Sequence, residues 1–128
     1  MLYQGIIGGG SSPVEPVVGD LLWTNPNPNG ELALTELQGD YSKYKSLIVE
    51  AKINVSADFT SEFNIAKSDG VYTAGICFTA ISLDEDYYRR ITLTDNKITL
   101  GSGIQVRSAT TITPRNNVAI PIKIYGVE

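Results

Sequence analysis

The residues best suited to chemistry in this sequence form one run, Tyr87, Tyr88, Arg89 and Arg90. Aromatic rings stack on the apolar faces of sugars, and the forked guanidinium group donates hydrogen bonds to hydroxyl or carboxylate oxygens. The run therefore predicts a carbohydrate-binding site. The alternative is that alternate members, Tyr87 with Arg89 or Tyr88 with Arg90, only pack on a sheet and cover its edges.

The chain has few residues for catalysis, with no histidine and a single cysteine. A Ser–His–Asp triad, its Cys–His relatives and the usual zinc sites are therefore excluded. The densest carboxylate group, Asp84-Glu85-Asp86, offers part of a calcium site or of a glycosidase pair. Its spacing fits no known calcium loop, and we interpret it as a solvated loop before a strand. We predict no catalytic residue, no metal site and no cofactor.

The composition is that of one globular domain. The chain has 128 residues, 42 % hydrophobic and 19 % charged, with a formal net charge of −4. Nucleic acid is not an expected partner, because phosphate binding needs clustered Lys and Arg. No apolar run approaches ~20 residues, and the first residues lack the basic start of a secretory signal. We therefore expect a protein made in the cytoplasm, without membrane insertion.

Two parts of the chain differ in composition. Residues 1–19 combine an apolar start with three consecutive glycines and two prolines, which predicts a flexible N-terminal arm with an extended segment. The apolar residues of this arm dock on a partner or on the rest of the chain; the alternative is that they belong to a disordered leader. Residues 20–128 are expected to form the head domain.

The head alternates apolar and polar residues with the period of two that is typical of β-strands. In residues 46–55, Leu47 and Val49 share one face, while Glu50 and Lys52 share the other. About eight or nine such segments, separated by turn signals, predict an all-β, antiparallel, jelly-roll-like β-sandwich. The expected strands are residues 21–24, 31–37, 46–55, 61–67, 71–83, 87–94, 97–100, 104–112 and 118–125.

A hairpin is expected around Asp95-Asn96, because both residues tolerate the positive φ of a two-residue turn. Only one register matches apolar with apolar residues and threonine with threonine, and a slip of one residue destroys the match. This register pairs Thr94 with Lys97, Leu93 with Ile98, Thr92 with Thr99 and Ile91 with Leu100. The following Gly101-Ser102-Gly103 predicts another turn.

Residues 71–83 are apolar on both faces, so this strand lies in the middle of a sandwich or is covered by another subunit. Cys77 in this strand is expected in the core. In the last strand, Pro121 cannot donate to a ladder, which predicts an edge position or a bulge. The expected subunit interface consists of Trp23, Tyr72, Ile76 and Phe78.

Several motifs resemble a group of small phage and prophage proteins from Gram-positive bacteria. The group opens on the LWTNPNP sequence found here at residues 22–28, followed by a turn and an apolar strand that correspond to residues 39–49. An Arg-rich strand leads to an ITL…GxG hairpin, matched at 89–103, and the group ends in Ile-Pro-x-x-Ile-Tyr-Gly, matched at 120–126. The departures are Tyr41 before Ser42 in the turn and a short glycine linker.

The resemblance implies a virion structural protein, such as the tip of a tail fibre, baseplate or head fibre, usually a homotrimer. It transfers no catalytic or ligand residue. We expect a virion component that contacts other virion proteins through its arm and attaches to a host-surface glycan. The alternatives are a monomeric carbohydrate-binding or adhesin-like module, a small glycan hydrolase, and a decoration protein without a ligand.

Overall fold

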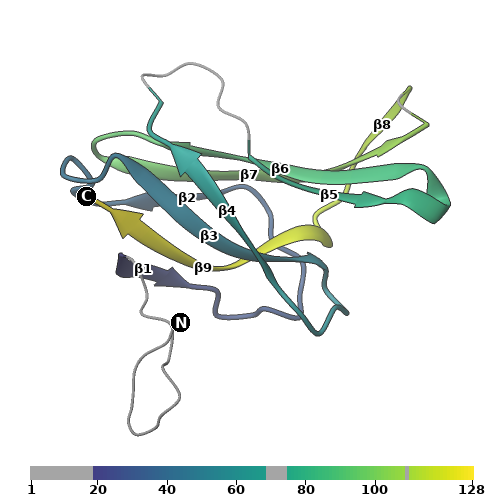
Figure 1. Ribbon diagram of the computed structural model, residues 1–128, viewed down its shortest axis with the longest axis horizontal. Helices are drawn as coiled ribbons and strands as arrows, with labels where there is room; N and C mark the ends of the chain where they lie inside the picture. The colour runs from purple at the N-terminus through teal and green to yellow at the C-terminus, as the bar shows by residue number, and fades with distance from the viewer. Residues whose placement is uncertain (1–18, 69–74, 109) are drawn as a thin grey trace, which may run out of the picture.

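The computed structural model describes residues 19–68, 75–108 and 110–128, and this part of the chain is a two-layered antiparallel β-sandwich (Figure 1). The predicted all-β sandwich is confirmed. The predicted arm, except Gly19, lies outside the described residues. The elements are β1 (Asp20–Thr24), β2 (Thr35–Gln38), β3 (Ser46–Asn54), β4 (Ser61–Ala66), β5 (Ile76–Ala80), the 3-10 helix η1 (Ile81–Leu83), β6 (Glu85–Leu93), β7 (Lys97–Arg107), β8 (Thr111–Pro114) and β9 (Val118–Val127).

The two sheets differ in length. One has four strands in the order β1-β9-β3-β4. The other, which we call the long sheet, has the order β2-β7-β6-β5 with β8 paired to β7. Their inner faces bury the apolar half of each alternating pattern, such as Leu47 and Val49 of β3 and Ile91 and Leu93 of β6. Burying one such side chain contributes about 1.5–3 kcal/mol, so the period of two decides which face of each strand turns inward.

The hairpin between β6 and β7 has the predicted register, which pairs Leu93 with Ile98 and Ile91 with Leu100. The predicted turn at residues 101–103 is wrong, because β7 continues through it to Arg107. The register instead shifts between Arg89 and Ile91. This shift is a β-bulge, in which one strand has an extra residue and the side chains beyond it are re-aimed.

Pro121 lies at a bulge and not at an edge, since β9 is paired with both β1 and β3. The pairing of β3 with β9 skips one residue between Pro121 and Lys123. Buried Asn25 occupies this irregularity: its backbone N–H donates to Ile122 O at 2.8 Å and its side-chain Nδ2 donates to Pro121 O at 2.9 Å. The two end motifs at residues 22–28 and 120–126 are therefore joined in the fold.

Three of the four predicted interface residues contact the interior of this chain. Ile76 is fully buried in the core, so its assignment to a subunit interface is wrong. Half-buried Trp23 and Phe78 pack against the same core, and the Phe78 ring meets the Phe63 ring edge-to-face with centroids 5.3 Å apart. Tyr72 lies outside the described residues.

The strand expected over residues 71–83 ends early, because η1 replaces its last three residues. Cys77 is exposed on the outer face of β5, and its predicted core position is wrong. The reason is the position of β5 at the edge of its sheet, whose outer face no described strand covers. Figure 1 shows β8 and the adjoining ends of β5, β6 and β7 extending beyond the four-stranded sheet.

Candidate functional site

The four predicted ligand residues lie on β6 and point alternately to opposite faces of the sheet. Tyr87 and Arg89 belong to the inner face, together with buried Ile91. Tyr88 and Arg90 belong to the outer face. The run therefore does not form one site, and each face must be considered by itself.

Arg89 lies in the core with no exposed surface. Each of its five N–H groups has a backbone carbonyl to bond, which satisfies the donors of a guanidinium group. Nε donates to Ala119 O at 2.8 Å, Nη1 to Leu32 O at 2.7 Å and Gly101 O at 2.6 Å, and Nη2 to Val118 O at 3.1 Å and Asn116 O at 3.3 Å. Burial lowers the pKa of Arg89 to about 10, so it stays charged at neutral pH.

The prediction that Arg89 contacts a ligand is therefore wrong. Its guanidinium joins β6 to the β7 bulge, to the start of β9 and to the loop that precedes β2. That loop also explains why the strand expected over residues 31–37 begins only at Thr35. The Leu32 N–H donates to Asn116 O at 3.0 Å, and the Leu32 carbonyl accepts from Arg89. Both backbone groups of Leu32 are therefore bonded outside the sheet.

Beyond Arg89, the inner face of the long sheet becomes polar. The strand register places side chains in two rows across four strands, at the end that extends past the other sheet (Figure 1). The first row is Phe78, Tyr87, Gln105 and Thr113, and the second is Ala80, Glu85, Arg107 and Thr111. Tyr87 is thus the one member of the predicted run that reaches this polar surface.

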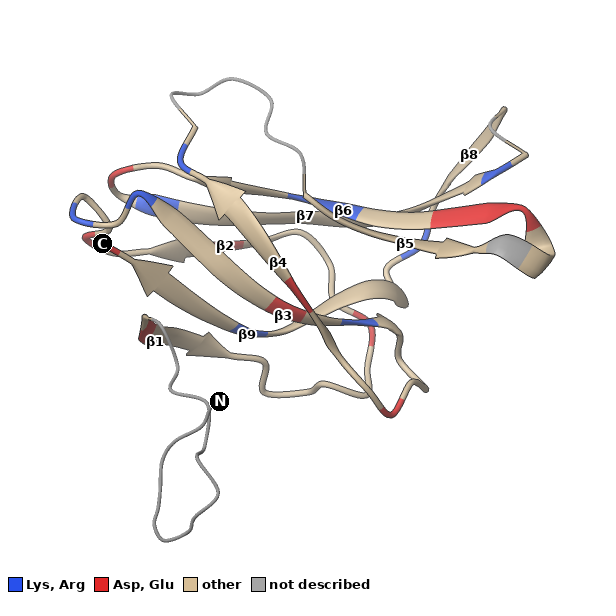
Figure 2. Cartoon of the chain, viewed as in Figure 1, with Lys and Arg blue, Asp and Glu red and all other residues tan. Residues whose placement is uncertain are grey.

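A groove of about 210 Å³ opens on this surface, and we call it the arginine groove. It is lined by Gln105, Arg107, Thr111, Thr113 and Arg115. Figure 2 shows the acidic start of β6 in red and Lys or Arg positions near β8 in blue at this end of the molecule, where Glu85 of β6 pairs with Arg107 of β7. Strands β7 and β8 supply four of the five lining residues, and Arg115 directly follows β8. Hydrogen-bonded backbone therefore holds most of the lining side chains in position.

A hydrogen-bond network forms the wall of the groove. Glu85, whose side chain is only 5 % exposed, accepts the Tyr87 hydroxyl at 2.5 Å on Oε1 and Arg107 Nε at 2.7 Å on Oε2. Arg115 Nη1 donates to Gln105 Oε1 at 2.8 Å, and its Nε donates to Asn117 Oδ1 at 3.3 Å. These contacts orient both guanidinium groups before any ligand arrives.

The network also changes two acid–base equilibria. The hydrogen bond from Tyr87, followed by that from Arg107, lowers the pKa of Glu85 below its ordinary value of 4.5. The same hydrogen bond to Glu85, together with burial, raises the pKa of Tyr87 above 10.0. At neutral pH, Glu85 is a carboxylate and Tyr87 is a neutral donor.

We expect Glu85 to stabilise the fold in a pH-dependent way. Because its pKa is lowered on folding, its contribution is present above pH 4.5 and is lost as pH falls through the folded-state pKa. A Glu85→Gln variant should therefore be less stable than wild type at pH 7, and the difference in stability should be smaller at pH 3. Urea unfolding at the two pH values measures this difference, and a gap of the same size at both values would contradict it.

Comparisons of the chain with protein-family models, with curated proteins and with solved structures found no match. The site must therefore be judged on its own geometry. Within the described ranges, no three His, Cys, Asp or Glu side chains are grouped so that they could hold a metal ion. No helix in this part of the chain has the length and apolar character needed to cross a membrane.

None of the five lining residues of the groove was predicted from the sequence. A usable signal was present, because Gln105 and Arg107 alternate with apolar Ile104 and Val106, and Thr111 alternates with Ile112. Interpreting residues 101–103 as a turn separated these residues from the β6 hairpin. With the bulge in place, the same pattern puts Gln105 beside Tyr87.

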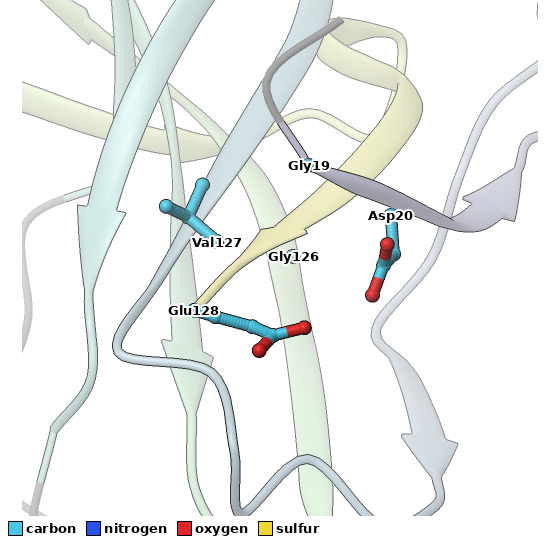
Figure 3. Close-up of a pocket in the computed structure, with 5 residues that line it drawn as sticks. All are labelled: Gly19, Asp20, Gly126, Val127 and Glu128. Atoms are coloured by element: carbon cyan, nitrogen blue, oxygen red, sulfur yellow. The ribbon is translucent and has the colours of Figure 1, made fainter.

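Two other cavities carry less chemistry. One, of about 230 Å³, lies between the ends of β1 and β9 (Figure 3). Its two carboxylates both pair with Lys43, whose Nζ lies 3.6 Å from Asp20 and 3.5 Å from Glu128. The second, of about 250 Å³, lies on the outer face of the long sheet beside Leu34, Arg90 and Ile104.

Proposed function

We propose that this chain is a structural protein of a phage or prophage virion, whose head attaches to a cell-surface glycan without catalysis. The motifs at residues 22–28 and 120–126 support the virion assignment. The β-sandwich is consistent with a binding module displayed on a particle, because its paired strands hold a surface in a fixed shape. The arginine groove supports attachment, and it is the observation that carries the proposal.

The groove has the donors and acceptors that sugar recognition requires. Arg107 and Arg115 present forked donors, and the exposed hydroxyls of Thr111 and Thr113 both donate and accept. The half-buried Tyr87 ring lies in the adjoining row of the same face. A two-carboxylate hydrolase needs a pair of acids flanking the bond, and the five lining residues include no acid.

Binding of a bacterial wall polysaccharide panel tests attachment. We expect wild type to bind at least one member and Arg115→Ala to lose most of that binding, while both keep the same thermal unfolding midpoint. Arg90→Ala is the matched control, because Arg90 is an exposed arginine on the opposite face, and it is compared at the same solution mass as wild type because that face also carries exposed apolar residues. Loss in Arg90→Ala alone would move the site to the outer face, and no binding to any member would refute attachment.

We also propose a homotrimer, assembled through the outer face of the long sheet, with the arm at residues 1–19 contacting other virion proteins. This face carries exposed apolar side chains, including Leu34 at 58 % and Ile112 at 66 % exposure. Cys77, Tyr88, Ile104 and Val106 extend the same surface. Three copies would turn a weak single-site contact into avidity for a repeated glycan.

Light scattering on a sizing column tests the trimer. We expect about three times the 13.8 kDa chain mass for wild type and the single-chain mass for Ile112→Asp. Since Ile112 is exposed, the charge should leave the fold intact. A single-chain mass for wild type would instead favour the monomeric carbohydrate-binding module, which uses the same groove.

A further inference from the structure

The solvent-facing charge of the arginine groove is positive, although the chain as a whole is acidic. Glu85 is the carboxylate in its wall, and it is 5 % exposed and already accepts Tyr87 and Arg107. The Arg107 side chain above it is 62 % exposed. The groove thus presents guanidinium groups to the solvent and keeps its carboxylate underneath.

Arg115 carries a charge that its protein contacts do not neutralise. Its two hydrogen-bond partners, Gln105 and Asn117, are neutral amides. No carboxylate of the described residues lies within ion-pair distance of Arg115. Its Nη2 donates to no described residue, so this group remains available beside the cavity.

Arg107 has a matching free edge. Its Nε and Nη2 are both directed at Oε2 of Glu85, at 2.7 Å and 2.5 Å, and Nη1 has no partner among the described residues. Arg107 and Arg115 line the same cavity, together with the hydroxyls of Thr111 and Thr113. Two outward guanidinium edges with hydroxyls between them form a binding site for an oxyanion, because guanidinium groups bond carboxylate and phosphate oxygens most strongly.

We infer that the arginine groove recognises a negatively charged glycan through a carboxylate or phosphate group bound between Arg107 and Arg115. This inference rests on the proposed attachment function and specifies its ligand class. The cavity, at about 210 Å³, is below the range of about 300–1,000 Å³ for pockets that enclose a drug-sized ligand. It suits one charged sugar or polyol unit of a polymer, and repetition of that unit supplies avidity.

The test compares polymers that differ in charge. Polygalacturonate and its fully methyl-esterified form share a backbone, and esterification removes the carboxylate charge. Poly(glycerol phosphate) supplies the phosphate form of the same oxyanion. Binding of each polymer to the full chain is measured by biolayer interferometry at two salt concentrations, for wild type, Arg115→Gln, Arg115→Lys and Arg90→Gln. All four proteins are first shown to have the same unfolding midpoint and the same solution mass, because Arg90 lies on the face proposed for the trimer contact.

We expect wild type to bind at least one charged polymer and to bind the methyl ester at least about tenfold more weakly, since hydrogen bonds to charged groups contribute more than neutral ones. Arg115→Gln should lose about the same factor, Arg115→Lys should retain part, and Arg90→Gln should bind like wild type. Preference for polygalacturonate or for poly(glycerol phosphate) identifies the oxyanion. Added salt should weaken all of this binding.

Three results would overturn the inference. Equal binding of the ester and the acid would show that charge is not recognised, and the attachment proposal would survive with a neutral ligand. Equal loss in Arg90→Gln and Arg115→Gln would show a diffuse charge effect outside the groove. Binding of neither charged polymer, together with binding of a neutral wall polysaccharide, would also refute it, whereas failure with every polysaccharide would refute attachment itself.

Discussion

Replacement of Arg89 by methionine is expected to lower the free energy of unfolding by about 3–5 kcal/mol. The variant leaves the carbonyls of Leu32, Gly101 and Ala119, among others, without their donor. Each buried polar group that loses its partner costs about 1–3 kcal/mol, and water entering the site recovers part of this. Native proteins have a total free energy of unfolding of about 5–15 kcal/mol, so this loss removes a large part of the stability of the fold.

Urea unfolding measures this loss, with two variants as controls. Arg90→Met makes the same chemical change at the next residue, which is exposed, and should stay within about 0.5 kcal/mol of wild type. Arg89→Lys keeps the charge but has three donors in place of five, so its stability should lie between the other two. Equal stability of Arg89→Met and Arg90→Met would contradict a structural role for Arg89.

The second large effect is expected for Gly103→Ala. A Cβ atom at this position would lie 2.0 Å from Arg115 O, and 2.9 Å from both Arg89 Nη2 and Val118 O. Two of these neighbours are backbone carbonyl oxygens, and one of them, Val118 O, accepts a hydrogen bond from Arg89. Relief of the clash therefore requires the loop after β8 to move. We expect a loss of about 3 kcal/mol, the upper end of the usual cost of overpacking.

Gly101→Ala is the matched control, two residues away on the same strand. Its Cβ would meet Arg90 O at 3.1 Å, with the next atoms at 3.6 Å and 3.8 Å. Neither glycine has a positive φ, so the contrast measures space and not backbone conformation. Because Gly→Ala removes about 0.4–1 kcal/mol of unfolded-chain entropy, Gly101→Ala should stay within about 1 kcal/mol of wild type. Comparable losses in the two variants would contradict this account.

The parts of the fold that depend on local patterns could be predicted from the sequence. The alternation of apolar and polar residues predicted that the β3 face with Leu47 and Val49 points into the core, because a register slip of one residue would expose that whole face. The β6–β7 register followed from matching pairs beside a two-residue turn. For Pro121, the missing N–H limited the possibilities to an edge or a bulge, and the structure shows a bulge.

The parts that depend on distant segments could not be predicted. Arg89 is buried because residues 32, 101, 116, 118 and 119 bring carbonyls to one point, and no local pattern reports that convergence. An arginine next to two tyrosines in the sequence can belong to a binding surface or to a core, and the local sequence does not distinguish the two positions. The sequence therefore predicted a ligand contact where the structure places a buried guanidinium.

The groove was missed for a related reason, which is the ambiguity of Gly101-Ser102-Gly103. Such a segment suits a turn or a bulge equally well, since glycine permits both. The hairpin register continued without a bulge would pair Tyr87 with Ile104, whereas the observed bulge pairs it with Gln105. One extra residue thus decides whether an apolar or a polar side chain stands beside Tyr87.

The most direct test of the central claim, that the arginine groove is the ligand site, is an NMR titration of the ¹⁵N-labelled chain with trigalacturonate or with tri(glycerol phosphate), whichever corresponds to the polymer that binds more tightly. The account predicts that the largest amide shifts occur in β7 and β8 around Gln105, Arg107, Thr113 and Arg115, and that they are absent in Arg115→Gln. Shifts centred on the outer face near Leu34 and Arg90, or unchanged shifts in Arg115→Gln, would contradict it.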